Sequence, residues 1–218
     1  MRDGSAQDVL PCLPVMLRLR GQRCVVVGGG AVAARRAASL VACGAQVVVV
    51  APAMDPKLDE LLIERAERGY EAGDLDGAFL VVIATDNPAV NQRVADEAAE
   101  AGVLINRADN AGAGDLTVMA HDRRGPLTLA VDTGQTSAAA AKAIRAELLE
   151  ALDDDWITLL TEARPWRAKI QSSVPDDSER ARRLRQLADD TAMQTLKHQG
   201  VSALRARLQA VAEGRADD

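Results

Sequence analysis

Apolar residues in the first half of the chain alternate between short unbroken runs and longer segments in which they recur at helical spacing. Short unbroken apolar runs are typical of strands that are buried on both faces of a parallel sheet. Such strands are expected at 25–27, 46–50, 80–84 and 103–105, with a weaker one at 70–72. Helices are expected at 31–43, 59–68 and 88–101, each followed by a glycine. This order of elements predicts an α/β fold.

The first strand leads directly into three glycines and an alanine-rich helical segment. Gly28, Gly30 and Ala33 fit the G-x-G-x-x-G/A spacing of dinucleotide-binding folds. In that motif Gly28 permits the sharp turn, Gly30 leaves room for a pyrophosphate, and Ala33 lets the helix lie close to the sheet. A glycine motif alone also fits an ordinary tight turn. The flanking strand and helix favour a nucleotide site.

The pattern changes in the second half of the chain. Short strands at 116–119 and 127–131, a polar turn at 121–125 and a long helix at 138–152 are expected there. Everything from 153 onwards reads as helix, with a linker at 172–178. Two short strands cannot fill a sheet alone, so we expect this central region to pair with a second copy of the chain.

Composition and charge exclude several classes of partner. The chain has 218 residues, a formal net charge of -6 and 2% aromatic residues. Such a chain lacks the basic and stacking surfaces that nucleic acids require. Acidic residues interleave the basic cluster at 180–185, which favours a solvated helix face over an anion site. No apolar run approaches a membrane span and residues 1–7 carry no secretion signal, so we expect a cytoplasmic protein without membrane contact.

Metal-ligating residues are few and scattered. Cys12, Cys24 and Cys43 show no metal-type spacing, and their odd number gives no disulfide framework. His121 and His198, the two histidines, do not pair with another ligand at metal spacing. We therefore expect no metal held by the protein and interpret His121 as a surface turn residue.

Several motifs between Leu13 and Ile170 occur in a characteristic order. They are the lead-in 13–15, the glycine motif at 25–33, the turn at 51–52, the stretch at 84–91, the pair Asn106 and Asp109, and the cap at 134–137. Singly these motifs are unspecific. In this order and spacing they resemble the sirohaem synthase family, and more closely its precorrin-2 dehydrogenase / sirohydrochlorin ferrochelatase module.

The resemblance implies an oxidoreductase that uses NAD to convert precorrin-2 into sirohydrochlorin. In bifunctional members a lyase step follows, in which ferrous iron is inserted to give sirohaem. It also implies a homodimer with three parts: a Rossmann-like NAD-binding domain at 1–110 with a parallel sheet, a small dimerisation segment at 111–150 and a helical domain at 151–218.

The site residues implied by the resemblance lie at the ends of the predicted strands. The family's catalytic aspartate falls on Asp109, where a carboxylate can accept a ring proton while a hydride leaves. Besides Gly28 and Gly30 of the motif, the cofactor contacts fall on Ala31, Val32, Pro52 and Ala53, and Thr85 is added from its position. Four arginines are candidate partners for the carboxylates of a tetrapyrrole: Arg18, Arg35, Arg107 and Arg123.

The choice between NAD and NADP is not evident from the second strand. Many dinucleotide-binding folds place an acidic residue at the end of this strand to bind the ribose. Val50 occupies that position here, and Asp55 is the nearest carboxylate.

Three departures from the family pattern concern the tetrapyrrole-facing and dimerisation region. Leu116 stands where the family usually has Phe, and Met119 and Ala138 stand where it usually has Pro. Thr133 matches a serine that is phosphorylated in some members. Two alternatives stay open: a nucleotide- or tetrapyrrole-binding relative without this catalysis, and an unrelated dehydrogenase on the same fold.

Overall fold

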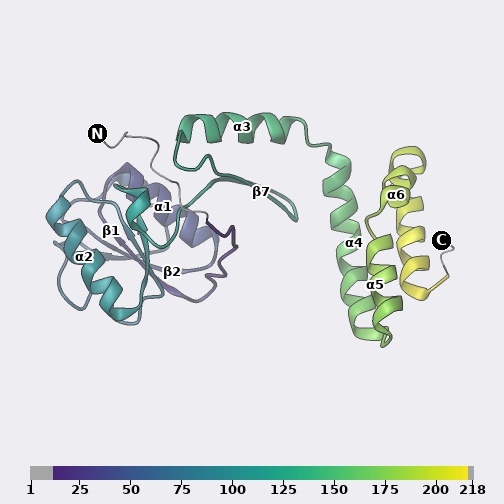
Figure 1. The fold of residues 1–218 in the computed structure, drawn as a ribbon, viewed down its shortest axis with the longest axis horizontal. Coiled ribbons are helices and arrows are strands. Elements are labelled where there is room, and N and C mark those ends of the chain that lie inside the picture. The colour runs from purple at the N-terminus through teal and green to yellow at the C-terminus, as the bar shows by residue number, and fades with distance from the viewer. Residues whose placement is uncertain (1–11, 216–218) are drawn as a thin grey trace, which may run out of the picture. The chain divides into compact units, whose positions relative to one another are not determined.

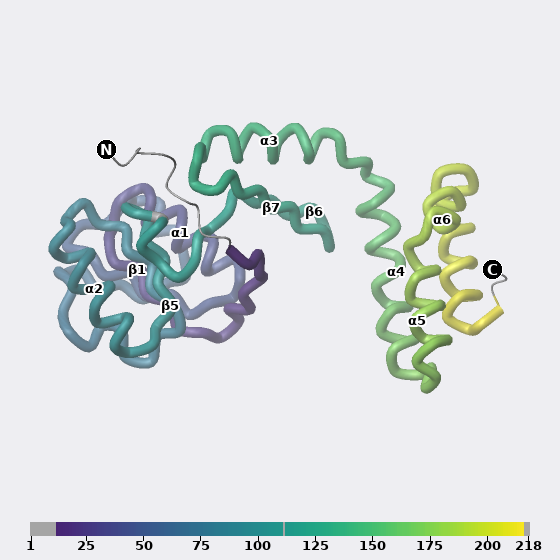
Figure 2. The backbone as a smooth tube through the Cα atoms, viewed as in Figure 1, coloured from purple at the N-terminus to yellow at the C-terminus, as the bar shows by residue number. Residues whose placement is uncertain are grey.

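The computed structural model describes residues 12–215, and the chain divides into two compact units, Met1–Val118 and Met119–Asp218. Figure 1 shows the first unit as a sheet with helices packed on it and the second as a hairpin followed by helices. The course of the backbone through each unit can be followed in Figure 2.

The first unit is built on a parallel sheet of five strands in the order β3-β2-β1-β4-β5. The strands are β1 (Arg23–Val27), β2 (Gln46–Val50), β3 (Glu64–Ala66), β4 (Leu80–Ile83) and β5 (Leu104–Arg107). The chain runs outward from β1 to β3 and then returns to β4 on the other side of β1. The winding direction therefore changes between β1 and β4, which is where open α/β sheets bind their ligands. The predicted parallel α/β fold is confirmed.

Helices α1 (Ala31–Ala42) and α2 (Pro88–Ala101) cover opposite faces of this sheet (Figure 1). Alternate residues of a strand point to opposite faces, so each strand supplies both layers of the core. Ala33 and Ala37 of α1 are fully buried in the cluster that contains Val26, whereas Val94 of α2 packs in the cluster with Val25. Small side chains on α1 thus let it lie close to the sheet, as predicted for Ala33.

Both helices end where the sequence places their stop signals. The side chain of Asn87 accepts hydrogen bonds from the first free amides of α2, and Pro88 follows it in the first turn. Gly102 takes a left-handed conformation with φ 68° directly after α2, and Gly44 does the same with φ 78° shortly after α1.

The prediction of a helix at 59–68 is wrong. A short 3-10 helix, η1 (Pro56–Leu58), and the edge strand β3 occupy this region instead. Leu62, an apolar residue that a helix here would be expected to turn toward the core, is 93% exposed. Backbone pairing of Glu64 and Ala66 with β2 outweighs the local helix preference of the glutamates and arginines. The weak strand at 70–72 is also absent from the described chain, and Tyr70 instead lies buried in the core.

The second unit begins with a hairpin of β6 (Ala120–Arg124) and β7 (Leu127–Val131), packed against α3 (Ala138–Glu150). The predicted strand at 116–119 and the predicted turn at 121–125 are therefore wrong. Residues 116–119 form no strand, and most of the predicted turn lies in β6. The turn is confined to Gly125 and Pro126, with Gly125 at φ 55°. Exposed and half-buried side chains alternate along β6, as is typical of a strand. Because most of these side chains are charged, the sequence indicated a polar turn instead.

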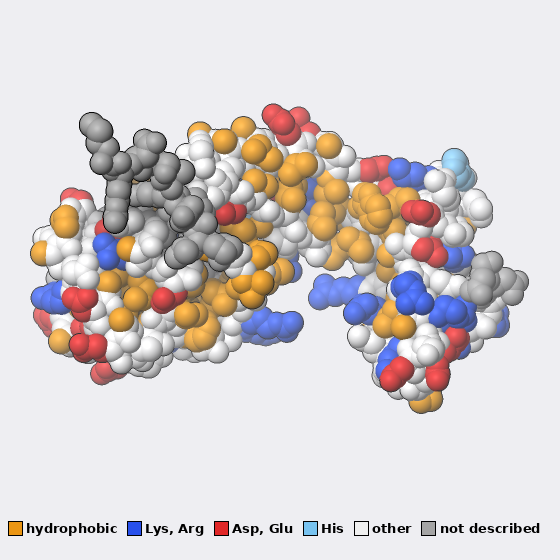
Figure 3. All heavy atoms as spheres, viewed as in Figure 1, with side chains coloured by type: hydrophobic (Ala, Val, Ile, Leu, Met, Phe, Trp, Pro, Cys, Tyr) orange, Lys and Arg blue, Asp and Glu red, His pale blue; other side chains and the backbone are white. Residues whose placement is uncertain are grey.

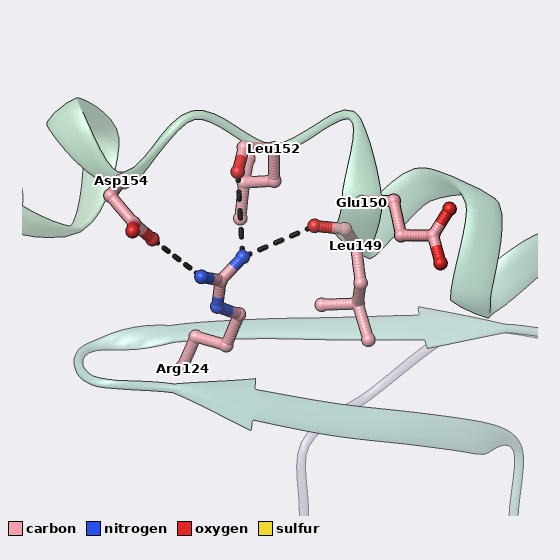
Figure 4. A pocket seen from close by; sticks show the side chains of 5 residues that line it. All are labelled: Arg124, Leu149, Glu150, Leu152 and Asp154. Carbon is pink, nitrogen blue, oxygen red and sulfur yellow. Dashed lines mark hydrogen bonds and ion pairs between the residues drawn. The ribbon is translucent and has the colours of Figure 1, made fainter.

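Arg124, at the end of β6, joins the hairpin to the connection between α3 and the next helix (Figure 4). Its guanidinium donates to the carbonyl oxygens of Leu149 and Leu152 at 3.1 and 3.4 Å and forms an ion pair with Asp154 at 2.5 Å. One side chain therefore binds the end of α3 and the beginning of the following helix.

The remainder of the second unit consists of α4 (Asp154–Ser173), α5 (Asp177–Gln186) and α6 (Asp190–Glu213). Leu159 and Ile170 of α4 are buried together with Leu204 and Leu208 of α6. The helical prediction is confirmed, but the linker is shorter than 172–178, because only 174–176 lie outside the helices. Within the basic cluster, Arg182 and Arg183 both pair with Glu179 on the same helix, and both side chains are half-buried rather than fully solvated.

Candidate active site

The predicted site residues follow the carboxyl ends of four neighbouring strands. The sheet register aligns Val50, Val27, Ile83 and Arg107 in one row across β2, β1, β4 and β5. Because all strands are parallel, the segments that follow this row emerge at the same edge. The glycine loop, the segment after β2, Thr85 and Asp109 therefore share the edge at which the winding direction changes.

The glycine loop after β1 is built as the motif requires. Gly28 has φ 125°, and a Cβ there would collide with the carbonyl oxygen of Ala84 at the end of β4. A Cβ on Gly30 would meet no atom of residues 12–215 within 4 Å, so space is open at the beginning of α1. No side chain in the described part of the chain caps the amides of this first turn. Free amides and open space at a helix N-terminus suit a phosphate group.

Gly29 is a functional position that the spacing motif missed. A Cβ on Gly29 would collide with the carbonyl oxygen of Ala53 and approach the Cβ of Ala51 at 2.8 Å. The carbonyl oxygen of Gly29 accepts a hydrogen bond from the amide of Asp55 at 2.7 Å. The loop after β1 and the segment after β2 are therefore in direct contact. The signal in the sequence was that a glycine also occupies the variable position of the motif, between Gly28 and Gly30.

The other residues predicted to bind the cofactor lie at the surface of this edge. Ala31, Pro52 and Ala53 are exposed, and the side chain of Val32 is 40% exposed although it is apolar. The carboxylate of Asp55 accepts a hydrogen bond from the amide of Lys57 at 2.9 Å and thereby begins η1. Asp55 thus has a structural partner at the beginning of η1.

Thr85 and Asn91 connect the end of β4 to α2. The hydroxyl of Thr85 donates to Oδ1 of Asn91 at 2.5 Å, and Nδ2 of Asn91 donates to the carbonyl oxygen of Thr85 at 3.1 Å. The same Nδ2 donates to Oδ2 of Asp109 at 3.0 Å. Asn91 is 1% exposed, which is unusual for an amide side chain and is explained by these hydrogen bonds. The network brings Thr85 and Asp109 together through one buried residue.

Asp109 is also held by Arg107, the last residue of β5. Nε of Arg107 donates to Oδ1 at 2.8 Å, and the second guanidinium nitrogen donates to Oδ2 at 2.7 Å. This pair, helped by Asn91, lowers the pKa of Asp109 to about 2, so the carboxylate is ionised throughout the neutral range. Arg107 was expected to bind substrate carboxylates. The structure pairs it with Asp109 instead, and its side chain is 10% exposed.

Asn106 does not share this network, although the sequence paired it with Asp109. Its Nδ2 donates to the carbonyl oxygen of Leu116 at 2.9 Å, and its buried Oδ1 has no hydrogen-bond partner among residues 12–215. Leu116, one of the departures from the family, packs against the sheet cluster of α1. Asn106 therefore fixes the segment that follows Asp109 rather than Asp109 itself.

The other candidates lie outside this edge or carry no site. His121 is exposed as expected, but it lies on β6 rather than in a turn. Across residues 12–215, no group of three or more His, Cys, Asp or Glu side chains could hold a metal ion.

Within residues 12–215, no helix combines the length and apolar character needed to span a membrane. Cys43 is an exposed free thiol and Cys24 a buried one, and Cys12 is exposed.

Comparisons with known proteins identify the family. A family model described as putative NAD(P)-binding matches residues 15–120. The siroheme (sirohaem) synthase of Chromobacterium violaceum is 38% identical over 177 residues, which cover 78% of this chain and 37% of that protein. That of Azotobacter vinelandii is 36% identical over 172 residues, with 77% and 37% covered. The chain belongs to the sirohaem synthase N-terminal module family. It spans little more than a third of the length of these curated relatives.

A solved structure supports the same conclusion for the fold. SirC, a precorrin-2 dehydrogenase, matches with a TM-score of 0.74 and 27% sequence identity, and the match covers 93% of this chain and 100% of SirC. The Rossmann-like first unit and the helical second unit are thus both features of this family. The family model and SirC indicate a nicotinamide dinucleotide as the class of cofactor. The glycine loop fits this class of cofactor. A Cβ would collide with neighbouring atoms at Gly28 and Gly29, whereas the space beside Gly30 is open.

Proposed function

We propose that the protein oxidises precorrin-2 to sirohydrochlorin with NAD. The observation that carries this proposal is an ionised, partly exposed carboxylate, Asp109, held by Arg107 and Asn91 at the same sheet edge as the glycine loop. A dehydrogenase needs a hydride acceptor and a proton acceptor at one site. The names of SirC and of the sirohaem synthases support precorrin-2 as the substrate.

Residues of the first unit would hold the cofactor at this edge. The amides of Gly30, Ala31 and Val32 face open space at the start of α1 and suit the pyrophosphate. Pro52 and Ala53 would line the ribose, and Thr85 would lie beside the nicotinamide. Residues 51–55 contain no Lys or Arg to receive a 2′-phosphate, which favours NAD over NADP.

The chemistry divides between the cofactor and Asp109. Bound NAD supplies the hydride acceptor. One hydride and one proton leave precorrin-2 as sirohydrochlorin forms, and the carboxylate of Asp109 accepts the proton. That carboxylate is ionised at neutral pH and can accept a proton, and the ion pair with Arg107 makes it a weaker base than an ordinary aspartate.

The test is anaerobic reduction of NAD with enzymatically generated precorrin-2, comparing the native protein with Asp109→Ala. We expect the native protein to form NADH and sirohydrochlorin in equal amounts. The variant should lose about 10²- to 10⁴-fold in rate, as is typical when a proton acceptor is removed. Binding of NAD without turnover by the native protein would favour a binding relative, and turnover of small hydroxy acids would favour an unrelated dehydrogenase.

Ferrous iron is proposed as a second substrate rather than a resident metal. Metal entry requires loss of two protons from pyrrole nitrogens, and the ionised carboxylate of Asp109 can accept them one at a time, releasing each to water before it takes the next. Addition of ferrous iron to the sirohydrochlorin formed in the same assay tests this step. Sirohaem formation above the rate without protein would make the chain bifunctional, and the uncatalysed rate alone would restrict it to dehydrogenation.

We further propose that the protein is a homodimer in the cytoplasm, joined through the region 111–150. Among the described side chains of α3 and the hairpin, Ala141 is the one buried residue, so this region has little core of its own. Figure 3 shows hydrophobic side chains gathered over α3 and the beginning of α4, where Ile144, Leu148 and Trp156 are between 41% and 48% exposed. A second copy would cover them. The free thiols of Cys24 and Cys43 support a reducing compartment.

A further inference from the structure

Asp109 receives three hydrogen bonds from two nearly buried side chains. Arg107 engages both carboxylate oxygens, and Asn91 adds a second donor to Oδ2. Arg107 is 9% exposed and Asn91 1% exposed, whereas the side chain of Asp109 is 28% exposed. The supporting residues are thus shielded from solvent, and the residue they support is accessible.

We propose that Arg107 and Asn91 are positioning residues that fix the Asp109 carboxylate so that Oδ1 accepts the substrate proton. A carboxylate offers about four acceptor positions, two on each oxygen. Both positions of Oδ2 are occupied by Arg107 and Asn91, whereas among residues 12–215 Oδ1 has one side-chain donor, Arg107. The remaining acceptor capacity therefore lies on Oδ1. This inference rests on the proposed function, since it assigns roles within the same site.

The geometry of the pair prevents the carboxylate from rotating. The planar fork of an arginine matches the two oxygens of a carboxylate, and turning the carboxylate would break both bonds at once. Asn91 cannot follow such a movement, because its own amide is fixed to Thr85 at two atoms. Arg107 lies at the end of β5 and Asn91 on α2, so two elements of the first unit define the direction of Oδ1.

The same contacts set the charge of Asp109. Arg107 of β5 is the cation that faces it, and Asn91 of α2 is neutral. The hydrogen bonds to Asp109 raise the pKa of Arg107, and the charge of Asp96 on α2 adds a smaller effect in the same direction. With Arg107 in place the carboxylate is ionised but weakly basic, and it takes the substrate proton at the acceptor position of Oδ1 that Arg107 leaves open. Without Arg107 the pKa of Asp109 should rise toward its ordinary value of ~3.9.

A titration that needs no substrate tests the ion pair directly. The side-chain carboxyl carbons are followed by ¹³C NMR from about pH 7 to pH 3.5, with Asp109→Asn to assign the signal. In the native protein the Asp109 signal should not move over this range, and in Arg107→Gln it should titrate with a midpoint near ~4. Arg107→Lys, which keeps the charge, should titrate lower than Arg107→Gln.

Arg68→Gln is the matched control for this titration. Arg68 forms a two-bond ion pair with Asp74 in the same unit, at 2.9 and 2.6 Å, away from the proposed site. Its removal should leave the Asp109 signal unmoved. An Asp109 signal that titrates near ~4 in the native protein, or that moves equally in Arg68→Gln and Arg107→Gln, would overturn the inference.

Kinetics then separate a positioning role from a structural one. Asn91→Ala should lower kcat by about 10²-fold, the typical cost of a misplaced catalytic group, while KM for precorrin-2 changes by less than about threefold. An unchanged kcat, or an equal loss of binding and turnover, contradicts the positioning role of Asn91. If the native protein does not oxidise precorrin-2 but Asp109 titrates as expected, the proposed function fails and the ion pair stands.

Discussion

The α-carbon of Gly29 faces the carbonyl oxygen of Ala53 so closely that no side chain fits between them. This contact joins the loop after β1 to the segment after β2, and the hydrogen bond from the amide of Asp55 to Gly29 reinforces it. The two segments proposed to hold the pyrophosphate and the ribose are therefore positioned by each other as well as by their strands.

The glycine loop gives a prediction that separates folding from binding. Gly29→Ala should displace both segments and destabilise the first unit by about 1–3 kcal/mol, the usual cost of local backbone strain. Gly30→Ala should leave stability nearly unchanged, because a Cβ there meets no described atom within 4 Å, yet it should weaken NADH binding by about tenfold or more. Thermal unfolding without cofactor and calorimetric titration with NADH measure the two effects. Equal stability losses in both variants would contradict this division.

Acid should lower the free energy of unfolding partly through protonation of Asp109. Its pKa is lowered in the folded state to about 2, so its contribution to stability is complete above the unfolded value of ~3.9 and is lost as the pH falls through about 2. The difference in unfolding free energy between the native protein and Asp109→Asn should therefore be constant from pH 7 to about 5 and shrink toward about pH 2. Urea unfolding at several pH values measures it. A difference that grows on acidification would show that the carboxylate is not stabilised by Arg107.

Much of this site could be predicted from the sequence. The contacts that the sequence did not predict were missed for a common reason. Val25, Val26 and the glycines that follow them mark β1 and its loop, because buried parallel strands and tight turns leave strong local patterns. Asn91 and Arg107 left no such pattern. A polar residue on a helix or at a strand end reads as exposed, and only the fold shows that both are buried against Asp109.

The errors in the fold have a similar origin. The segment containing β3 has the composition of a helix, and pairing with β2 at the sheet edge decides otherwise. β6 carries His121, Asp122 and two arginines, a composition typical of a loop. Its strand is stabilised by partners distant in sequence, such as Arg145 of α3, which pairs with Asp122 at 3.2 Å.

Removal of the Arg124 side chain should loosen the connection between α3 and α4. Its two hydrogen bonds to carbonyl oxygens satisfy groups at the end of α3, so Arg124→Ala should cost about 1–3 kcal/mol. Asp154→Ala should cost under about 1 kcal/mol, because the ion pair that it removes is largely exposed. Hydrogen exchange should show faster exchange at 149–155 in Arg124→Ala but not in Asp154→Ala. Equal exchange in the two variants would assign the effect to the ion pair instead.

The proposed dimer depends on the exposed apolar face of α3. Leu148 is 48% exposed and Ile144 42% exposed, and they lie one helical turn apart on this face. A glutamate at Leu148 would bury a charge in the interface without a partner, so Leu148→Glu should convert the dimer into a monomer at micromolar concentration. Light scattering gives the mass. Leu62→Glu is the matched control, because Leu62 is 93% exposed in the first unit and its replacement should leave the dimer intact. A native protein that is already monomeric would overturn the proposed dimer. A dimer that persists in Leu148→Glu would place the contact on another surface.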